Sequence, residues 1–134
     1  MNGNEVKQRK ERKETKHLIL EIKDGVLFAV FKSGKIAYSD AIEIINERLE
    51  YTEGNSYPAI ATTEKNLVID KLAREYFRSD DGVKGLSAMA MVEDKKYTQI
   101  LINFLLKFYK SPIPMSIFTT EEDAEKWIKS LNIN

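Results

Sequence analysis

The hydrophobic pattern is clearest near the start of the chain, where two apolar runs surround a turn dipeptide. Residues 18–22 read Leu-Ile-Leu-Glu-Ile, and residues 26–31 read Val-Leu-Phe-Ala-Val-Phe. Asp24-Gly25, between them, tolerates the positive φ angles of a two-residue type I′ turn. We therefore predict a β-hairpin over residues 17–32. Because both faces of the second run are apolar, we expect that strand to be covered on both sides.

Downstream, apolar positions follow helical spacing in four segments. The predicted helices begin near Ser39 or Asp40, after Asp70, near Asp94 or Lys95, and after Thr119 or Thr120. Short apolar segments before the second, third and fourth helices, at residues 59–62, 85–92 and 115–118, predict strands. Ala and Met in the middle segment also suit a helix, but the flanking Gly82 and Glu93-Asp94 favour a strand.

Apolar stripes mark the faces that the later helices should bury. In the helix after Asp70 the predicted inward residues are Leu72, Ala73, Tyr76 and Phe77. The third helix, ending near Lys110, has a wide stripe formed by Tyr97, Ile100, Leu101, Phe104, Leu105 and Phe108. The last helix buries Ala124, Trp127, Ile128 and Leu131, and either Thr119 with Glu122 or Thr120 with Asp123 forms its capping box.

The order of elements predicts the fold class. A hairpin followed by alternating helices and strands (ββαβαβαβα) gives an α/β protein with an antiparallel start and a parallel remainder. At 134 residues the chain is most simply one domain, which we place at residues 17–134. Residues 63–69 are predicted to be a loop.

Residues 1–16 lack apolar periodicity. They carry six basic and three acidic side chains, which is typical of a solvated, flexible basic arm. The alternative is a basic arm that binds nucleic acid or an acidic partner, but the interspersed glutamates and the lack of aromatic residues disfavour it.

Composition excludes several classes of function. The chain has no Cys, so thiol chemistry and disulfides are excluded. Lys plus Arg and Asp plus Glu both number 21, so net charge gives no reason to expect nucleic acid as a partner. No apolar run approaches the roughly 20 residues of a membrane span, and the N-terminus lacks the apolar region of a secretory signal. We expect a cytoplasmic protein.

Candidate catalytic and metal-binding residues are few. The only His, His17, stands at a predicted strand start, where an ordinary structural role is expected rather than a base or ligand. The acidic clusters 79–82 and 121–123 are explained by a turn and a helix N-terminus, and no phosphate-binding glycine motif occurs. We therefore predict no catalytic residues, no metal, no cofactor and no enzyme activity.

From residue 17 onward, the order of elements resembles the STAS-like fold of anti-sigma-factor antagonists, the SpoIIAA-like group. The segment Ile69-Asp70-Lys71-Leu72-Ala73 carries the resemblance, together with the closing strand and helix around residues 117–131. In regulatory members of that group, an I-D-S-S-G segment opens a helix, and phosphorylation of its second Ser controls partner binding. Here Leu72 occupies that position, so the resemblance implies a module without this phospho-switch.

The resemblance implies a non-enzymatic regulatory or binding module, with a protein partner as the first expectation. Its surface is predicted at loop 63–71, because ligands of open α/β sheets favour the carboxyl ends of parallel strands. Asp70, Lys71 and Arg74 are the candidate binding residues, although capping and ordinary surface roles would also explain them. The alternative is a carrier of a small apolar or lipid-like ligand. An apolar cleft beside this loop would favour the carrier.

Overall fold

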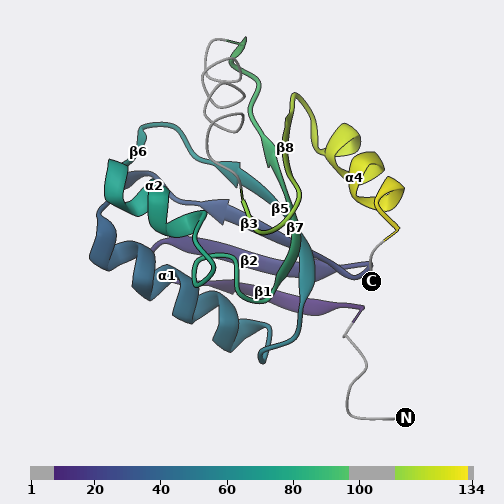
Figure 1. Cartoon of the computed structure of the whole chain (residues 1–134), viewed down its shortest axis with the longest axis horizontal. Helices are drawn as coiled ribbons and strands as arrows, with labels where there is room; N and C mark the ends of the chain where they lie inside the picture. The colour runs from purple at the N-terminus through teal and green to yellow at the C-terminus, as the bar shows by residue number, and fades with distance from the viewer. Residues whose placement is uncertain (1–7, 97–110, 133–134) are drawn as a thin grey trace.

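The structure is a computed structural model that describes residues 8–96 and 111–132 (Figure 1). Its strands are β1 (Lys10–Glu14), β2 (Leu18–Lys23), β3 (Val26–Phe31), β4 (Gly34–Ile36), β5 (Tyr57–Thr63), β6 (Leu67–Ile69), β7 (Leu86–Val92) and β8 (Met115–Phe118). Its helices are α1 (Tyr38–Tyr51), α2 (Lys71–Phe77) and α4 (Glu121–Ser130). The predicted helix between residue 94 and Lys110 falls mostly outside the described residues.

The predicted α/β fold class is confirmed. Strands β1-β2-β3-β5-β7-β8 form one sheet in that order; β1, β2 and β3 are antiparallel, and β3, β5, β7 and β8 are parallel. The hairpin has the predicted turn, with φ of 51° at Asp24 and 75° at Gly25.

Two hydrophobic clusters lie on opposite faces of the sheet. Helices α1 and α2 cover one face, where Leu18, Ile44 and Ala73 are buried in the larger cluster. Helix α4 covers the other, where Ala124 and Ile128 pack with Ile60 of β5 and Ala90 of β7. Because successive residues of a strand point to opposite faces, central strand β5 is buried on both sides from Tyr57 to Ala61.

The prediction of a flexible arm is wrong for residues 10–14. These residues form β1, which pairs antiparallel with β2 at the edge of the sheet. The Tyr51 hydroxyl lies 2.7 Å from the carbonyl oxygen of Glu11, and Lys10 Nζ donates to the Tyr51 carbonyl oxygen at 2.6 Å. The sequence hides this strand because nearly all of it is exposed on both faces, so it has no apolar alternation. Residues 1–7 lie outside the described residues.

A second, two-stranded sheet was not predicted. Strand β4 pairs in parallel with β6, so part of the expected loop 63–69 is extended. The backbone N–H of Asp70 then donates to the carbonyl oxygen of Ile36 at 3.0 Å. The starts of α1 and α2 are thereby held together.

The helix starts agree only in part with the predictions. Helix α1 begins earlier than expected, after Ala37, and the Asp40 carboxylate accepts from the Ala37 backbone N–H at 2.9 Å. The Asp70 cap of α2 is confirmed, with an accepted bond from the Ala73 backbone N–H at 2.9 Å. For α4, the cap is Thr120 rather than Thr119, because the Thr120 hydroxyl accepts a hydrogen bond from the Asp123 backbone N–H at 3.1 Å.

The predicted inward face of α2 is partly wrong. Ala73 is buried and Tyr76 and Phe77 pack against the core, but Leu72 is 61% exposed. Helix α2 is short and buries only Ala73 completely, and the neighbouring residue 72 lies on its exposed side.

Candidate functional site

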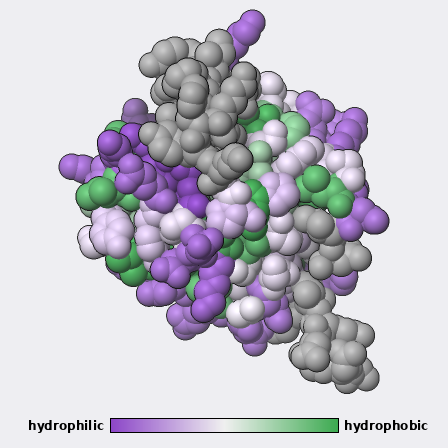
Figure 2. Space-filling view, viewed as in Figure 1, coloured by the Kyte–Doolittle hydropathy of each residue, from purple (hydrophilic) through white to green (hydrophobic). Residues whose placement is uncertain are grey.

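An apolar cavity of about 240 Å³ lies against the face of the sheet that α1 and α2 cover. Strands β3, β5 and β7 supply Phe31, Ala61, Met89 and Met91, among others, and α2 supplies Phe77. Figure 2 shows hydrophobic side chains in the middle of this view, between the polar surfaces of α2 and α4. Thr63 and Ile69, at the two ends of the predicted loop, also line the cavity, so the cleft beside that loop is apolar.

The charged residues that line the cavity are mostly cations. Arg48, Arg74 and Arg78 are among its lining residues, and Glu93 is the only acidic one among the described residues. Arg48 comes from α1, Arg74 from α2, and Arg78 is the C-cap residue of α2. An apolar cavity bordered by guanidinium groups suits a ligand with an apolar body and an anionic group.

Arg48 is a buried cation. Its side chain leaves the apolar stripe of α1 and donates from Nη2 to the carbonyl oxygen of Gly82 at 3.0 Å. The residue is only 5% exposed. Among the described residues, Nη1 has no hydrogen-bond partner and no carboxylate forms an ion pair with Arg48. Burial lowers the pKa of Arg48 to about 10, so the side chain still carries its charge at neutral pH.

The three predicted binding residues do not all lie at the cavity. Asp70 is the cap of α2, and Lys71 is the exposed first residue of that helix. Arg74 is also exposed; it donates from Nη1 to the Ile69 carbonyl oxygen at 2.9 Å and lines the cavity. Of the three predicted residues, the structure therefore brings Arg74 alone to the cavity.

Sequence reasoning missed Arg48 and Arg78. One signal for Arg48 was available, because it continues the buried stripe of Ala41 and Ile44 at helical spacing. A charged residue in such a stripe is rarely fully buried without a partner, so it marks a special environment. Nothing in the local pattern distinguishes Arg78 from a surface arginine.

Exposed apolar side chains surround the start of α2. Val68 and Leu72 are 59% and 61% exposed, and Tyr38 is 45% exposed. Tyr38 makes an edge-on contact with the ring of Tyr76, one helical turn after Leu72, at a centroid distance of 5.4 Å. We call Tyr38, Val68 and Leu72 the apolar patch. Leu72, which belongs to this patch, has no hydroxyl group that could be phosphorylated.

No helix within residues 8–96 and 111–132 is long and apolar enough to cross a membrane.

Comparison with known proteins identifies the fold and the family. A crystal structure of an uncharacterised protein of the DUF3478 family from Shewanella loihica PV-4, described as having a SpoIIAA-like fold, superposes with a TM-score of 0.56. The two sequences are 17% identical, and the match covers 86% of this chain and 97% of that one. The fold is therefore SpoIIAA-like, as the resemblance implied. No curated protein matches this chain. The model of the family described as "Domain of unknown function (DUF7793)" matches residues 20–132, and the chain belongs to that family.

Proposed function

We propose that this protein is a non-enzymatic binding module that carries a small amphipathic anion. The apolar part of the ligand occupies the cavity, and its anionic group lies beside the arginines at α2. The observation that carries the proposal is the apolar lining combined with three arginines and one carboxylate among the described lining residues. This lining favours the ligand carrier, which was the alternative in the sequence analysis, over the protein partner, which was the first expectation there.

The volume of the cavity limits the size of the ligand. About 240 Å³ lies just below the range of roughly 300–1,000 Å³ that is usual for ligand pockets, but above the 150 Å³ or so that admits benzene. A short alkyl chain or a single ring system fits these limits. A long acyl chain would have to extend into solvent.

Arg74 is the best residue for testing recognition of the anionic group. It is exposed, so its replacement should leave the fold intact, whereas Arg48 is buried and bonded to Gly82. A guanidinium gains more from a carboxylate than from a hydroxyl group, because both hydrogen-bonding partners are charged. Loss of Arg74 should therefore weaken binding of an acid more than binding of the matching alcohol.

The test measures displacement of a fluorescent apolar dye by decanoate and by decanol. We expect decanoate to bind more tightly than decanol, and Arg74→Gln to reduce this preference about fivefold, or about 1 kcal/mol. Arg12→Gln, an exposed arginine on β1 outside the cavity lining, is the charge-matched control and should bind like the wild type. Ala61→Leu fills part of the cavity and should weaken binding of both compounds.

Two results would contradict the carrier proposal. One is that neither compound binds to folded wild-type protein and that native mass spectrometry after gentle purification shows only the mass of the apo chain. The other is binding that Ala61→Leu leaves unchanged, because such binding would occur elsewhere on the molecule.

The apolar patch supports a second proposal, a protein partner that docks at the start of α2. Exposed Val68 and Leu72 beside Lys71 would supply buried apolar area with a polar rim, as in protein interfaces. Affinity capture from native lysate should recover a defined partner with wild type and lose it with Leu72→Ser. Glu122→Gln, on exposed α4 surface, should retain it. A partner retained by Leu72→Ser would place docking elsewhere.

A further inference from the structure

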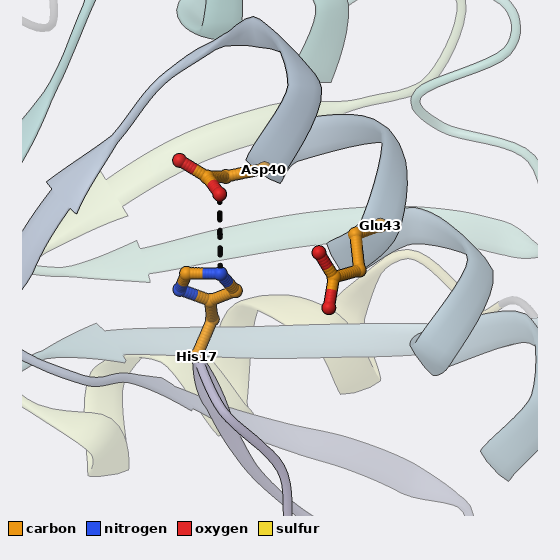
Figure 3. Close-up of side chains that lie close together, drawn as sticks. All are labelled: His17, Asp40 and Glu43. Atoms are coloured by element: carbon orange, nitrogen blue, oxygen red, sulfur yellow. Dashed lines mark ion pairs between the residues drawn. The ribbon is translucent and has the colours of Figure 1, made fainter.

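His17, Asp40 and Glu43 lie together where β2 and α1 begin, away from the cavity lining (Figure 3). His17 directly precedes β2, while Asp40 and Glu43 are three residues apart on α1 and therefore share a face of the helix. One potential ligand atom from each residue lies within 4.8 Å of the other two. In Figure 3 the Asp40 carboxylate lies above the imidazole ring and the Glu43 carboxylate lies to its right.

An ordinary ion pair explains this arrangement incompletely. His17 Nε2 lies 3.5 Å from Asp40 Oδ1, longer than the roughly 2.7–2.9 Å of a good charge-assisted hydrogen bond. The Nε2 atom is shielded from solvent and has no hydrogen-bond partner in the described chain, and the side chain of His17 is only 13% exposed. A buried polar nitrogen without a partner is costly, and coordination of a cation would satisfy it.

The second oxygen of Asp40 already has a role that orients the carboxylate. Oδ2 accepts from the Ala37 backbone N–H at 2.9 Å. This bond orients the carboxylate so that Oδ1 is held towards His17, as a hydrogen-bonded metal ligand is. Glu43 is exposed, so its carboxylate can adjust by rotation of the side chain.

We propose that His17, Asp40 and Glu43 bind a divalent transition-metal ion of the Zn²⁺ type, with water as the remaining ligand. One imidazole nitrogen and two carboxylate oxygens suit such an ion better than Mg²⁺ or Ca²⁺, which prefer oxygen ligands alone. Ligands about 2.1 Å from a tetrahedral ion lie about 3.4 Å apart, close to the 3.5 Å between Nε2 and Oδ1. The ion would join the start of β2 to the first turn of α1.

The test titrates chelator-treated full-length protein, made without a polyhistidine tag, with Zn²⁺, Co²⁺ and Mg²⁺. We expect Zn²⁺ to raise the melting temperature, Co²⁺ to give visible absorption bands typical of low coordination number, and Mg²⁺ to do neither. His17 is the only His and the chain has no Cys, so a response that depends on His17 locates the site. The cavity plays no part in this result, which is independent of the carrier proposal.

Matched variants separate metal binding from the ion pair alone. His17→Gln, Asp40→Asn and Glu43→Gln should each weaken Zn²⁺ binding at least about tenfold. Asp40→Asn keeps an acceptor for the Ala37 N–H, so the helix start is preserved. Glu50→Gln, an exposed glutamate near the other end of α1, is the control and should bind as the wild type does. No Zn²⁺ binding by the wild type, or binding that His17→Gln or Glu43→Gln leaves unchanged, would overturn the proposal.

Discussion

Gly82 and Arg48 together hold the turn before β7 against helix α1. The Arg48 guanidinium donates to the Gly82 carbonyl oxygen, and the Gly82 backbone lies against the end of α2. The Gly82 N–H in turn donates to the Ser79 hydroxyl at 3.1 Å. Two residues that are distant in sequence thus fix one wall of the cavity.

We expect Gly82→Ala to destabilise the protein strongly. A Cβ at this position would overlap the carbonyl oxygen of Tyr76 and lie 2.8 Å from Phe77 Cα, and both are backbone atoms that cannot move independently. The free energy of unfolding should fall by about 3 kcal/mol, measured by urea denaturation.

Gly54→Ala is the control for this substitution. No atom of the described residues lies within 4 Å of a Cβ added at Gly54, but φ there is +76°. The variant therefore reports the backbone cost alone, about 1 kcal/mol. Equal losses in the two variants would show that the turn at Gly82 relaxes freely.

At the scale of elements, the sequence predicts the helices and strands that can be recognised from residues close together in the chain. The hairpin depends on Asp24-Gly25 between two apolar runs, and α4 on a cap and an apolar stripe, so both are readable from neighbouring residues. Strands β4 and β6 are three residues each and exist through pairing with one another across more than thirty positions, which no local pattern records. Strand β1 is hidden for a different reason: it pairs with the nearby β2, but its residues are all charged and nearly all exposed, so they show no apolar alternation.

The same distinction applies to the candidate site. Asp70 was found because capping is a local property, and Arg74 because it follows on the same short helix. The cavity joins residues of α1, α2 and several strands, so its arginines become a group only in the folded chain.

The N-cap of helix α4 should contribute measurably to the stability of the protein. Thr120→Ala removes the acceptor for the Asp123 N–H and should lower the free energy of unfolding by about 1 kcal/mol in urea denaturation. Thr120→Ser retains a hydroxyl and should stay within a few tenths of a kcal/mol of the wild type. If both variants lost the same amount, the methyl group of Thr120 would be responsible rather than the cap.

At the scale of the whole molecule, helix α4 buries one face of the main sheet. Among the described residues, its Ala124 and Ile128 supply the helical side of the smaller cluster, against Ile60 and Ala90. The ring of Trp127 lies 5.5 Å from that of Phe118 on β8 and extends the contact.

Truncation before Glu121 should therefore cost several kcal/mol, because it exposes side chains of two central strands. We expect loss of cooperative thermal unfolding in the truncated chain, measured by circular dichroism. A chain that ends at Leu131 retains the helix and should unfold like the wild type. A soluble, cooperatively folded chain without residues 121–134 would contradict this role of α4.

Strand β1 forms a charged edge of the main sheet, where another copy of the protein could otherwise pair. It covers the backbone edge of apolar β2, and its own sequence, Lys-Glu-Arg-Lys-Glu, consists entirely of charged residues. A charged edge strand discourages pairing with the sheet of another molecule, which is a common route to aggregation. We therefore expect the N-terminal segment, which the sequence presents as a solvated arm, to oppose association between folded copies of the chain.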